Sequence, residues 1–180
     1  MGVYLATPLL PLRTAVGATF STFTTKQDVS PQPVPVARAG QLMRGTGLWL
    51  KACGEYSSLT GASLTLGFWI GTAALSITVS LAETSVFTTG TTPAAWPWDL
   101  EWSGLIVADG VSGSIVGQGA CQLGSSLTAV TATPFPITQA LRTVTIDTTI
   151  DRAFGVSATW GASSGSNSIK CNDFKAMLTS

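Results

Sequence analysis

Apolar and polar residues alternate along most of the chain beyond residue 47. The clearest alternation has its apolar positions at Leu64, Leu66, Phe68, Ile70, Leu75, Ile77, Val79 and Leu81. A period of two is typical of a β-strand with one buried face. A turn near Gly71 divides the run, which therefore predicts a hairpin with strands at 64–70 and 75–81. We expect the polar face of this hairpin to meet solvent or a neighbouring subunit through Thr65, Ser76, Thr78 and Ser80.

The same period predicts the other strands. They cover 48–56, 98–106, 111–123, 144–146, 154–160 and 169–171, and the last continues past a bulge to residue 178. Glycines interrupt the run at 111–123, which bulges or close packing would explain. No segment shows a convincing helical period. About eight strands without helices predict an all-β fold, an antiparallel β-sandwich of the jelly-roll type.

Residues 1–45 are predicted to form an extended, proline-rich N-terminal arm, and residues 46–180 the jelly-roll β-sandwich domain. Five of the nine prolines lie in the arm, at Pro8, Pro11, Pro31, Pro33 and Pro35. Because proline favours extended backbone and the arm has little core of its own, we expect it to gain order across neighbouring subunits. A short strand within 18–25 would pair at a sheet edge.

Charged residues are scarce and balanced, with nine Lys plus Arg and nine Asp plus Glu. Such a surface offers little attraction to phosphate backbones, so no nucleic-acid partner is expected. A low net charge also removes one barrier to self-association. The uncharged stretch between Glu55 and Glu83 would suit a membrane span. Its glycines and hydroxyl residues lower the hydropathy and no basic cluster flanks it, so no membrane segment is expected.

The cysteines and the N-terminus indicate synthesis in a reducing cytoplasm. Cys53, Cys121 and Cys171 are far apart, and the chain has no histidine that could complete a zinc site. Their odd number argues against a secreted disulfide framework, so they are predicted to be buried free thiols. The first residues lack a basic segment and Ala6 breaks the myristoylation pattern, so neither a signal peptide nor a lipid anchor is expected.

Few residues are candidates for chemistry. Without histidine, the Ser-His-Asp and Cys-His catalytic arrangements are excluded. Asp99 and Glu101 share one face of a strand about 7 Å apart and could form a glycosidase pair. The solvated face of a strand explains them more simply. Asp147 and Asp151 could hold calcium weakly, but turn capping is favoured.

Tryptophans and glycines also have structural explanations. The six tryptophans, Trp49, Trp69, Trp96, Trp98, Trp102 and Trp160, could include a platform on which a sugar stacks, but core and interface packing is favoured. Gly113, Gly117 and Gly119 do not form a phosphate-binding loop because no Lys-Ser/Thr pair follows them. No catalytic, cofactor-binding or metal-binding residue is assigned, and no cofactor is expected.

Several segments, taken in order, resemble a group of small structural proteins of tailed bacteriophages. The resemblance covers roughly residues 42–178. It rests on a Leu-Thr-Leu-Gly hairpin at 64–67, a Pro-Trp-x-Leu-Glu strand at 97–101, a glycine-broken strand at 113–119 and a closing Trp to Asn-x-Ile element at 160–169. Each motif is short, so the order of the motifs carries the resemblance.

The resemblance implies a non-enzymatic virion component, such as a capsid decoration (cement) protein, head fibre, minor capsid or minor tail protein. In that group the jelly rolls are often trimeric. The expected partners are the major capsid protein or other virion proteins, together with copies of this chain, and the expected location is the virion, assembled in the host cytoplasm. The alternatives are a carbohydrate-binding receptor-recognition module of a fibre or tail and a glycoside-cleaving enzyme. No catalytic residue is carried over.

Overall fold

The computed structural model describes residues 6–9, 17–72, 76–90, 92–124, 129–136 and 142–179. These residues form two antiparallel sheets and no helix, which confirms the predicted all-β sandwich. The eight-stranded sheet contains β1 (Ala6–Pro8), β2 (Thr19–Ser21), β5 (Gly47–Ser57), β9 (Trp96–Ala108), β10 (Gly113–Gly124), β11 (Val130–Phe135), β12 (Thr143–Ile146) and β14 (Ser168–Thr179). The six-stranded sheet contains β3 (Gln27–Asp28), β4 (Val36–Ala37), β6 (Ser63–Gly71), β7 (Val79–Glu83), β8 (Phe87–Thr88) and β13 (Arg152–Trp160).

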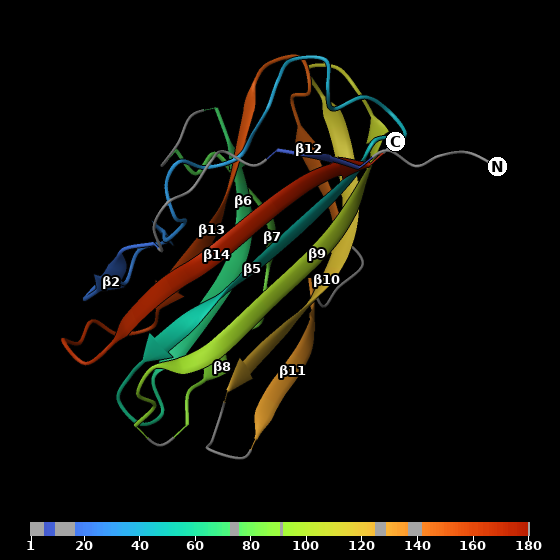
Figure 1. Cartoon of the computed structure of the whole chain (residues 1–180). Helices are drawn as coiled ribbons and strands as arrows, with labels where there is room; N and C mark the ends of the chain where they lie inside the picture. The colour runs from blue at the N-terminus through green and yellow to red at the C-terminus, as the bar shows by residue number, and fades with distance from the viewer. Residues whose placement is uncertain are drawn as a thin grey trace.

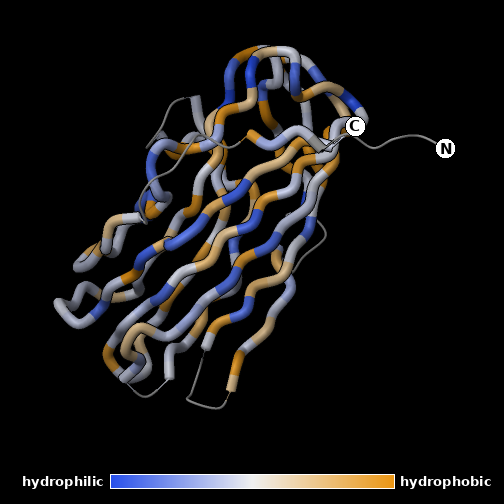
Figure 2. Tube along the Cα trace, viewed as in Figure 1, coloured by the Kyte–Doolittle hydropathy of each residue, from blue (hydrophilic) through white to orange (hydrophobic). Residues whose placement is uncertain are grey.

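The long strands pair in a nested order (Figure 1). β5 pairs with β14, β6 pairs with β13, and β9 and β10 form a hairpin at the centre of the chain. Strands from the first half of the chain therefore pair with strands from the second half, an arrangement that is typical of a jelly roll. A tube coloured by hydropathy shows apolar and polar residues alternating along these strands (Figure 2).

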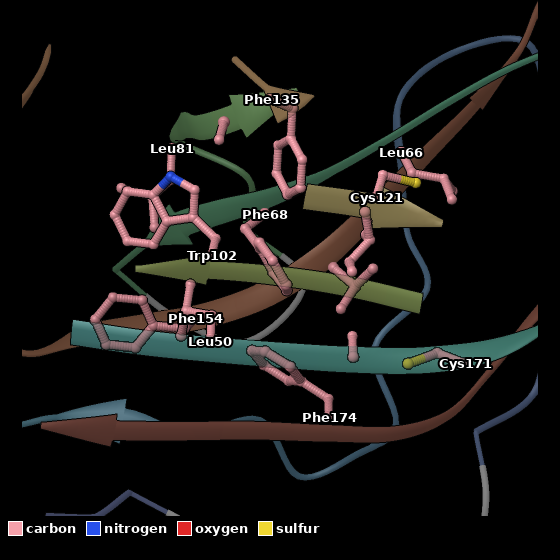
Figure 3. Packing of buried hydrophobic residues seen from close by; sticks show 14 of the residues in the cluster. Leu50, Leu66, Phe68, Leu81, Trp102, Cys121, Phe135, Phe154, Cys171 and Phe174 are labelled. Atoms are coloured by element: carbon pink, nitrogen blue, oxygen red, sulfur yellow. The ribbon is translucent and has the colours of Figure 1, made fainter. Parts of the chain in front are cut away.

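Aromatic side chains from both sheets meet in the core (Figure 3). The ring of Phe68 on β6 lies 5.9 Å from that of Phe174 on β14 and 6.2 Å from that of Phe135 on β11. All three side chains are fully buried. These contacts cross from one sheet to the other. The apolar residues that alternate along each strand therefore face inward and pack between the two sheets.

The predicted hairpin exists, but its second strand begins later than expected. β6 and β7 are antiparallel partners, and β7 starts at Val79. Residues 76–78 are not in a strand, so the predicted start of the second strand is wrong there, and Leu75 lies outside the described residues. The Thr78 amide still donates to the Ile70 carbonyl oxygen, at 3.2 Å. The connection is therefore longer than the two-residue turn expected at Gly71.

The second face of this hairpin is less open than expected. Thr78 is exposed, but Thr65, Ser76 and Ser80 are half-buried. Ser80 accepts a hydrogen bond from Lys26, which also forms an ion pair with Glu83. The N-terminal segment of the same chain therefore covers part of the face that was expected to meet solvent or a neighbour.

The described part of the predicted arm packs on its own sandwich. β3 and β4 both pair with β13, and β2 pairs with the edge of β14, which confirms the short strand expected within 18–25. The expectation of little core in this segment is wrong between residues 27 and 45. Four apolar side chains there are buried, those of Val29, Val34, Ala37 and Leu42. The domain boundary at residue 45 stays a prediction.

A buried carboxylate fastens this segment to the six-stranded sheet. Asp28 is 3% exposed, and its Oδ1 accepts hydrogen bonds from the Ser30 amide (2.9 Å), the Ser30 hydroxyl (2.6 Å) and Trp69 Nε1 (3.1 Å). Ser30 Oγ also accepts from the Val156 amide at 2.7 Å. Asp28 Oδ2 is buried and has no hydrogen-bond donor. The bonds to Ser30 and Trp69 tie the segment, while the unpaired oxygen makes the charged carboxylate costly.

Replacement of Asp28 by asparagine is expected to remove one component of the pH dependence of stability. Burial raises the pKa of Asp28 above its ordinary value of 3.8, although the hydrogen bonds from Ser30 and Trp69 lower it. The folded state therefore holds this proton more tightly than the unfolded state does. Its contribution to the free energy of unfolding is largest below pH 3.8 and falls as the pH rises through the folded pKa.

Urea unfolding of wild type and Asp28→Asn at a series of pH values from about 3 to 8 would measure this. The variant is expected to gain stability relative to wild type as the pH rises. Asp109→Asn, at an exposed carboxylate, is the control for the loss of one surface carboxylate. If the free energy of unfolding changed with pH in the same way for wild type and Asp28→Asn, the pKa of Asp28 would not be raised in the folded state.

No helix in the described part of the chain is long and apolar enough to cross a membrane.

Candidate binding surfaces

Asp99 and Glu101 lie on the outer face of β9, where both carboxylates face the same lysine. Lys51 Nζ is 3.8 Å from Asp99 Oδ2 and 3.5 Å from Glu101 Oε2. Trp49 Nε1 donates to Glu101 Oε1 at 2.9 Å. These contacts match the favoured interpretation, a solvated strand face, and leave the two carboxylates sharing a cation.

Asp147 caps the turn at the end of β12, whereas Asp151 ties that turn to residues 38 and 39 of the N-terminal segment. Asp147 Oδ1 accepts from the Thr149 amide at 2.9 Å and the Thr149 hydroxyl at 2.6 Å, and these bonds lower its pKa. Asp151 Oδ1 accepts from the Ala39 amide at 2.8 Å, which is the largest cause of its lowered pKa, and Oδ2 binds Arg38 at 2.7 Å. Turn capping is therefore confirmed at Asp147. No group of acidic, histidine or cysteine ligands suited to a metal occurs among the residues described.

The three cysteines are thiols and not disulfides, as predicted, but only two of them are buried. Cys121 and Cys171 lie in the core, where Figure 3 shows their sulfur atoms. Burial raises the pKa of Cys121 to about 12, which keeps the thiol protonated. The prediction of burial is wrong for Cys53, which is half-buried on the outer face of β5 because the residue alternates outward with Lys51 and Glu55.

Four tryptophans are core residues, in agreement with the favoured interpretation. Trp69, Trp98, Trp102 and Trp160 are at most 2% exposed. Trp96 is partly buried against the core. Trp49 is half-buried on the outer face of the eight-stranded sheet, beside Glu101. Trp49 is thus the tryptophan whose indole lies on the outer face of the sheet, at β5.

The outer face of the eight-stranded sheet is hollowed along β9 and β10. Cross-strand register places Trp49, Ser103 and Gln118 in one row across this face. Two adjoining cavities of about 580 and 400 Å³ lie here, and Ser103, Gln118 and Arg142 line both. We call these two cavities together the β9–β10 groove.

Glycines beneath this groove are required by Trp102 on the inner side of the sheet. A Cβ atom at Gly104 would lie 2.2 Å from the Trp102 ring, and one at Gly117 would lie 2.1 Å from it. The glycines in the predicted strand at 111–123 are therefore explained by close packing at Gly117 and by a bulge beside Ser114. The indole occupies the space that two side chains would take.

Arg142 reaches the groove because β12 pairs with β10. Thr143 is the register partner of Val116, which brings the preceding arginine alongside β10. The Arg142 Nε is buried and has no hydrogen-bond partner. Sequence reasoning missed this residue, although Arg142 is the only charged residue between Asp109 and Asp147. Its isolation in a long uncharged stretch could have marked Arg142 as a candidate binding residue.

A second surface lies at one end of the sandwich, at the top of Figure 1. It is formed by residues 38–46, by the end of β9 with the turn into β10 at 105–113, and by residues 147–151. We call it the apical end. The Gly45 amide donates to the Ile106 carbonyl oxygen at 2.9 Å, and the Thr148 amide donates to the Gly110 carbonyl oxygen at 3.0 Å. Its exposed apolar side chains are Met43, Leu105, Val107, Val111 and Ile150.

Comparison with known proteins adds no family. No protein-family model matches the chain. No curated protein matches it in sequence. A solved structure of the polysaccharide lyase family 18 protein aly-SJ02 is similar over 93% of this chain and 90% of its own, with 9% identity and a TM-score of 0.30. A TM-score this low supports no argument about function.

Proposed function

We propose that the chain is a non-enzymatic structural component of a bacteriophage virion, a capsid decoration (cement) or minor capsid protein. The order of the motifs between residues 42 and 178 supports the phage assignment. The apical end supports a role in assembly, because several large apolar side chains are exposed together there in the isolated chain. This apical surface is the observation that carries the proposal.

The exposed apolar residues are unevenly distributed. Eight large apolar side chains of the described residues are exposed, and five of them lie at the apical end. Val111 is 73% exposed and Met43 is 56% exposed. Grouped exposure of this kind marks protein interaction sites more often than scattered exposure does. We infer that the major capsid protein, or another virion protein with an apolar, weakly charged surface, covers the apical end.

Association between copies of the chain, with a trimer favoured by the resemblance, belongs to the same proposal. The scarcity of charge on the chain favours such association. Within the described residues, most lysines and arginines already have carboxylate partners in the same chain, so little charge remains to oppose contact.

Introducing a charge at the apical end is expected to reduce incorporation into particles. Val111→Asp would bury an unpaired carboxylate in the proposed interface, and we expect at least about a tenfold loss of the protein from purified particles. The matched control is Val86→Asp, since Val86 is 64% exposed outside the apical turns. The measurement is quantitative mass spectrometry of virions made with each variant. Equal incorporation of both variants would contradict docking through the apical end.

A second candidate function, recognition of a carbohydrate receptor, is favoured by one observation. The β9–β10 groove joins amide, hydroxyl and guanidinium groups on one open sheet face. Such groups can donate hydrogen bonds to the hydroxyls of a glycan and accept bonds from them. The two surfaces share Leu105 at the end of β9 and otherwise differ in their residues, so the two functions can be tested separately at Arg142 and Val111.

A further inference from the structure

Arg142 is a cation without a partner in the β9–β10 groove. Six lysines and arginines of the described residues form ion pairs, namely Lys26, Arg38, Lys51, Arg152, Lys170 and Lys175. Arg142 forms none with a described residue, and its buried Nε lacks an acceptor. An unsatisfied buried donor costs about 1–3 kcal/mol. Because this nitrogen is buried, a ligand in the groove would meet the other atoms of Arg142, which lines both cavities.

Glu101 does not supply this oxygen, although it lines one of the two cavities. Its Oε1 accepts from Trp49 Nε1 at 2.9 Å, and its Oε2 lies 3.5 Å from Lys51 Nζ. Both carboxylate oxygens therefore face partners on β5. The charge of Arg142 remains available to a ligand.

The other polar groups of the groove suit hydroxyl groups. Ser103 and Gln118 are exposed and directly opposite each other in the strand register. Thr143 adds a second hydroxyl to the lining of the groove. An amide can both donate to and accept from neighbouring hydroxyls of a sugar ring. Leu105 and Val116 supply apolar surface that the C–H face of a ring can cover.

The floor of the groove disfavours a peptide ligand. β10 is paired with β9 along one edge, and along its other edge with β12 at 113–116 and with β11 at 119–124. Among the described residues this leaves only Gly117 and Gln118 unpaired on that edge, too short a stretch for an extended peptide to pair along. An extended peptide gains affinity mainly by pairing with a free strand edge, and the groove lies on the face of the sheet. Side chains alone remain for recognition, which is typical of carbohydrate sites.

We propose that the β9–β10 groove binds an acidic carbohydrate, with a sugar carboxylate on the Arg142 guanidinium and ring hydroxyls on Gln118 and Ser103. The proposal gives a ligand class to the second candidate function and is independent of docking through the apical end. A particle protein with this site would attach to acidic surface glycans while its apical end held it to the particle.

The test is titration calorimetry of the full chain with tetragalacturonate, compared with a neutral galactose tetrasaccharide and with hexaglutamate. We expect the acidic sugar to bind and both other probes to bind at least about tenfold more weakly. Arg142→Gln is expected to weaken binding of tetragalacturonate by about 10- to 100-fold, since a charge-assisted hydrogen bond is lost. Arg142→Lys should recover part of that loss.

Arg44→Gln is the matched control, because Arg44 is an exposed arginine at the apical end and is not among the residues that line the groove. It should bind tetragalacturonate like wild type. The proposal is overturned if wild type does not bind tetragalacturonate, if Arg142→Gln and Arg44→Gln bind it equally, or if hexaglutamate binds as tightly. Particle incorporation of Arg142→Gln should equal that of wild type, so failure here is separable from failure of the apical docking.

Discussion

Replacement of Trp102 by alanine is expected to lower the free energy of unfolding by about 3–5 kcal/mol. Its indole is 1% exposed and fills the space above Gly104 and Gly117, so truncation leaves a cavity that two glycines cannot fill. The measurement is urea unfolding followed by tryptophan fluorescence and circular dichroism. Leu59→Ala, at a side chain that is 50% exposed, is the control and should change stability by less than about 1 kcal/mol.

Gly104 provides a sharper test of the same packing. A Cβ at this position would meet only the Trp102 ring among its three nearest atoms, at 2.2, 2.7 and 2.9 Å. Gly104→Ala should therefore cost about 1–3 kcal/mol in the wild-type protein and much less when Trp102 is replaced by leucine. Additive effects of Gly104→Ala and Trp102→Leu in the double variant would contradict the packing described here.

Replacement of Gly155 by alanine is expected to release the N-terminal segment and to cost about 2–3 kcal/mol. An added Cβ would lie 2.4 Å from Ser30 Oγ and 2.4 Å from the Trp69 ring. Trp69 is fully buried and cannot move aside without losing its bond to Asp28. The clash therefore falls on the contacts that hold residues 28–30 against β13.

Limited trypsin digestion together with urea unfolding would measure this release. Gly155→Ala should be cleaved faster than wild type at Lys26 and Arg38, which lie on either side of the fastened residues. Gly165→Ala is the matched control, because a Cβ there would meet nothing within 4 Å. If Gly155→Ala kept the digestion rate and stability of Gly165→Ala, the segment would not be fastened at this site.

The strands that face the core could be predicted from sequence because their alternation is local. The predicted strand from Leu64 to Ile70 lies within β6, and the bulge expected before residue 174 occurs between Cys171 and Asp173. The strands β3 and β4 were missed because their burial depends on a sheet formed by residues more than a hundred positions away. Val29 and Ala37 show no period of their own and become core residues only against β13.

The candidate surfaces show the same division. Asp99 and Glu101 could be placed on one face of a strand from their spacing, but their shared partner Lys51 comes from β5. Arg142 enters the β9–β10 groove only through the pairing of β12 with β10. Neither pairing can be read from the spacing of residues along the chain, because register is set by the packed sheet.

The most direct test of the proposed role in the virion is cryo-electron microscopy of purified particles of the phage that, on this proposal, encodes the chain, with mass spectrometry of the same particles. We expect the chain to be present and its two-sheet sandwich to appear on the particle, with Met43 and Val111 of the apical end covered by another virion protein or a second copy. Purified, infectious particles that lack the chain would contradict the proposed function.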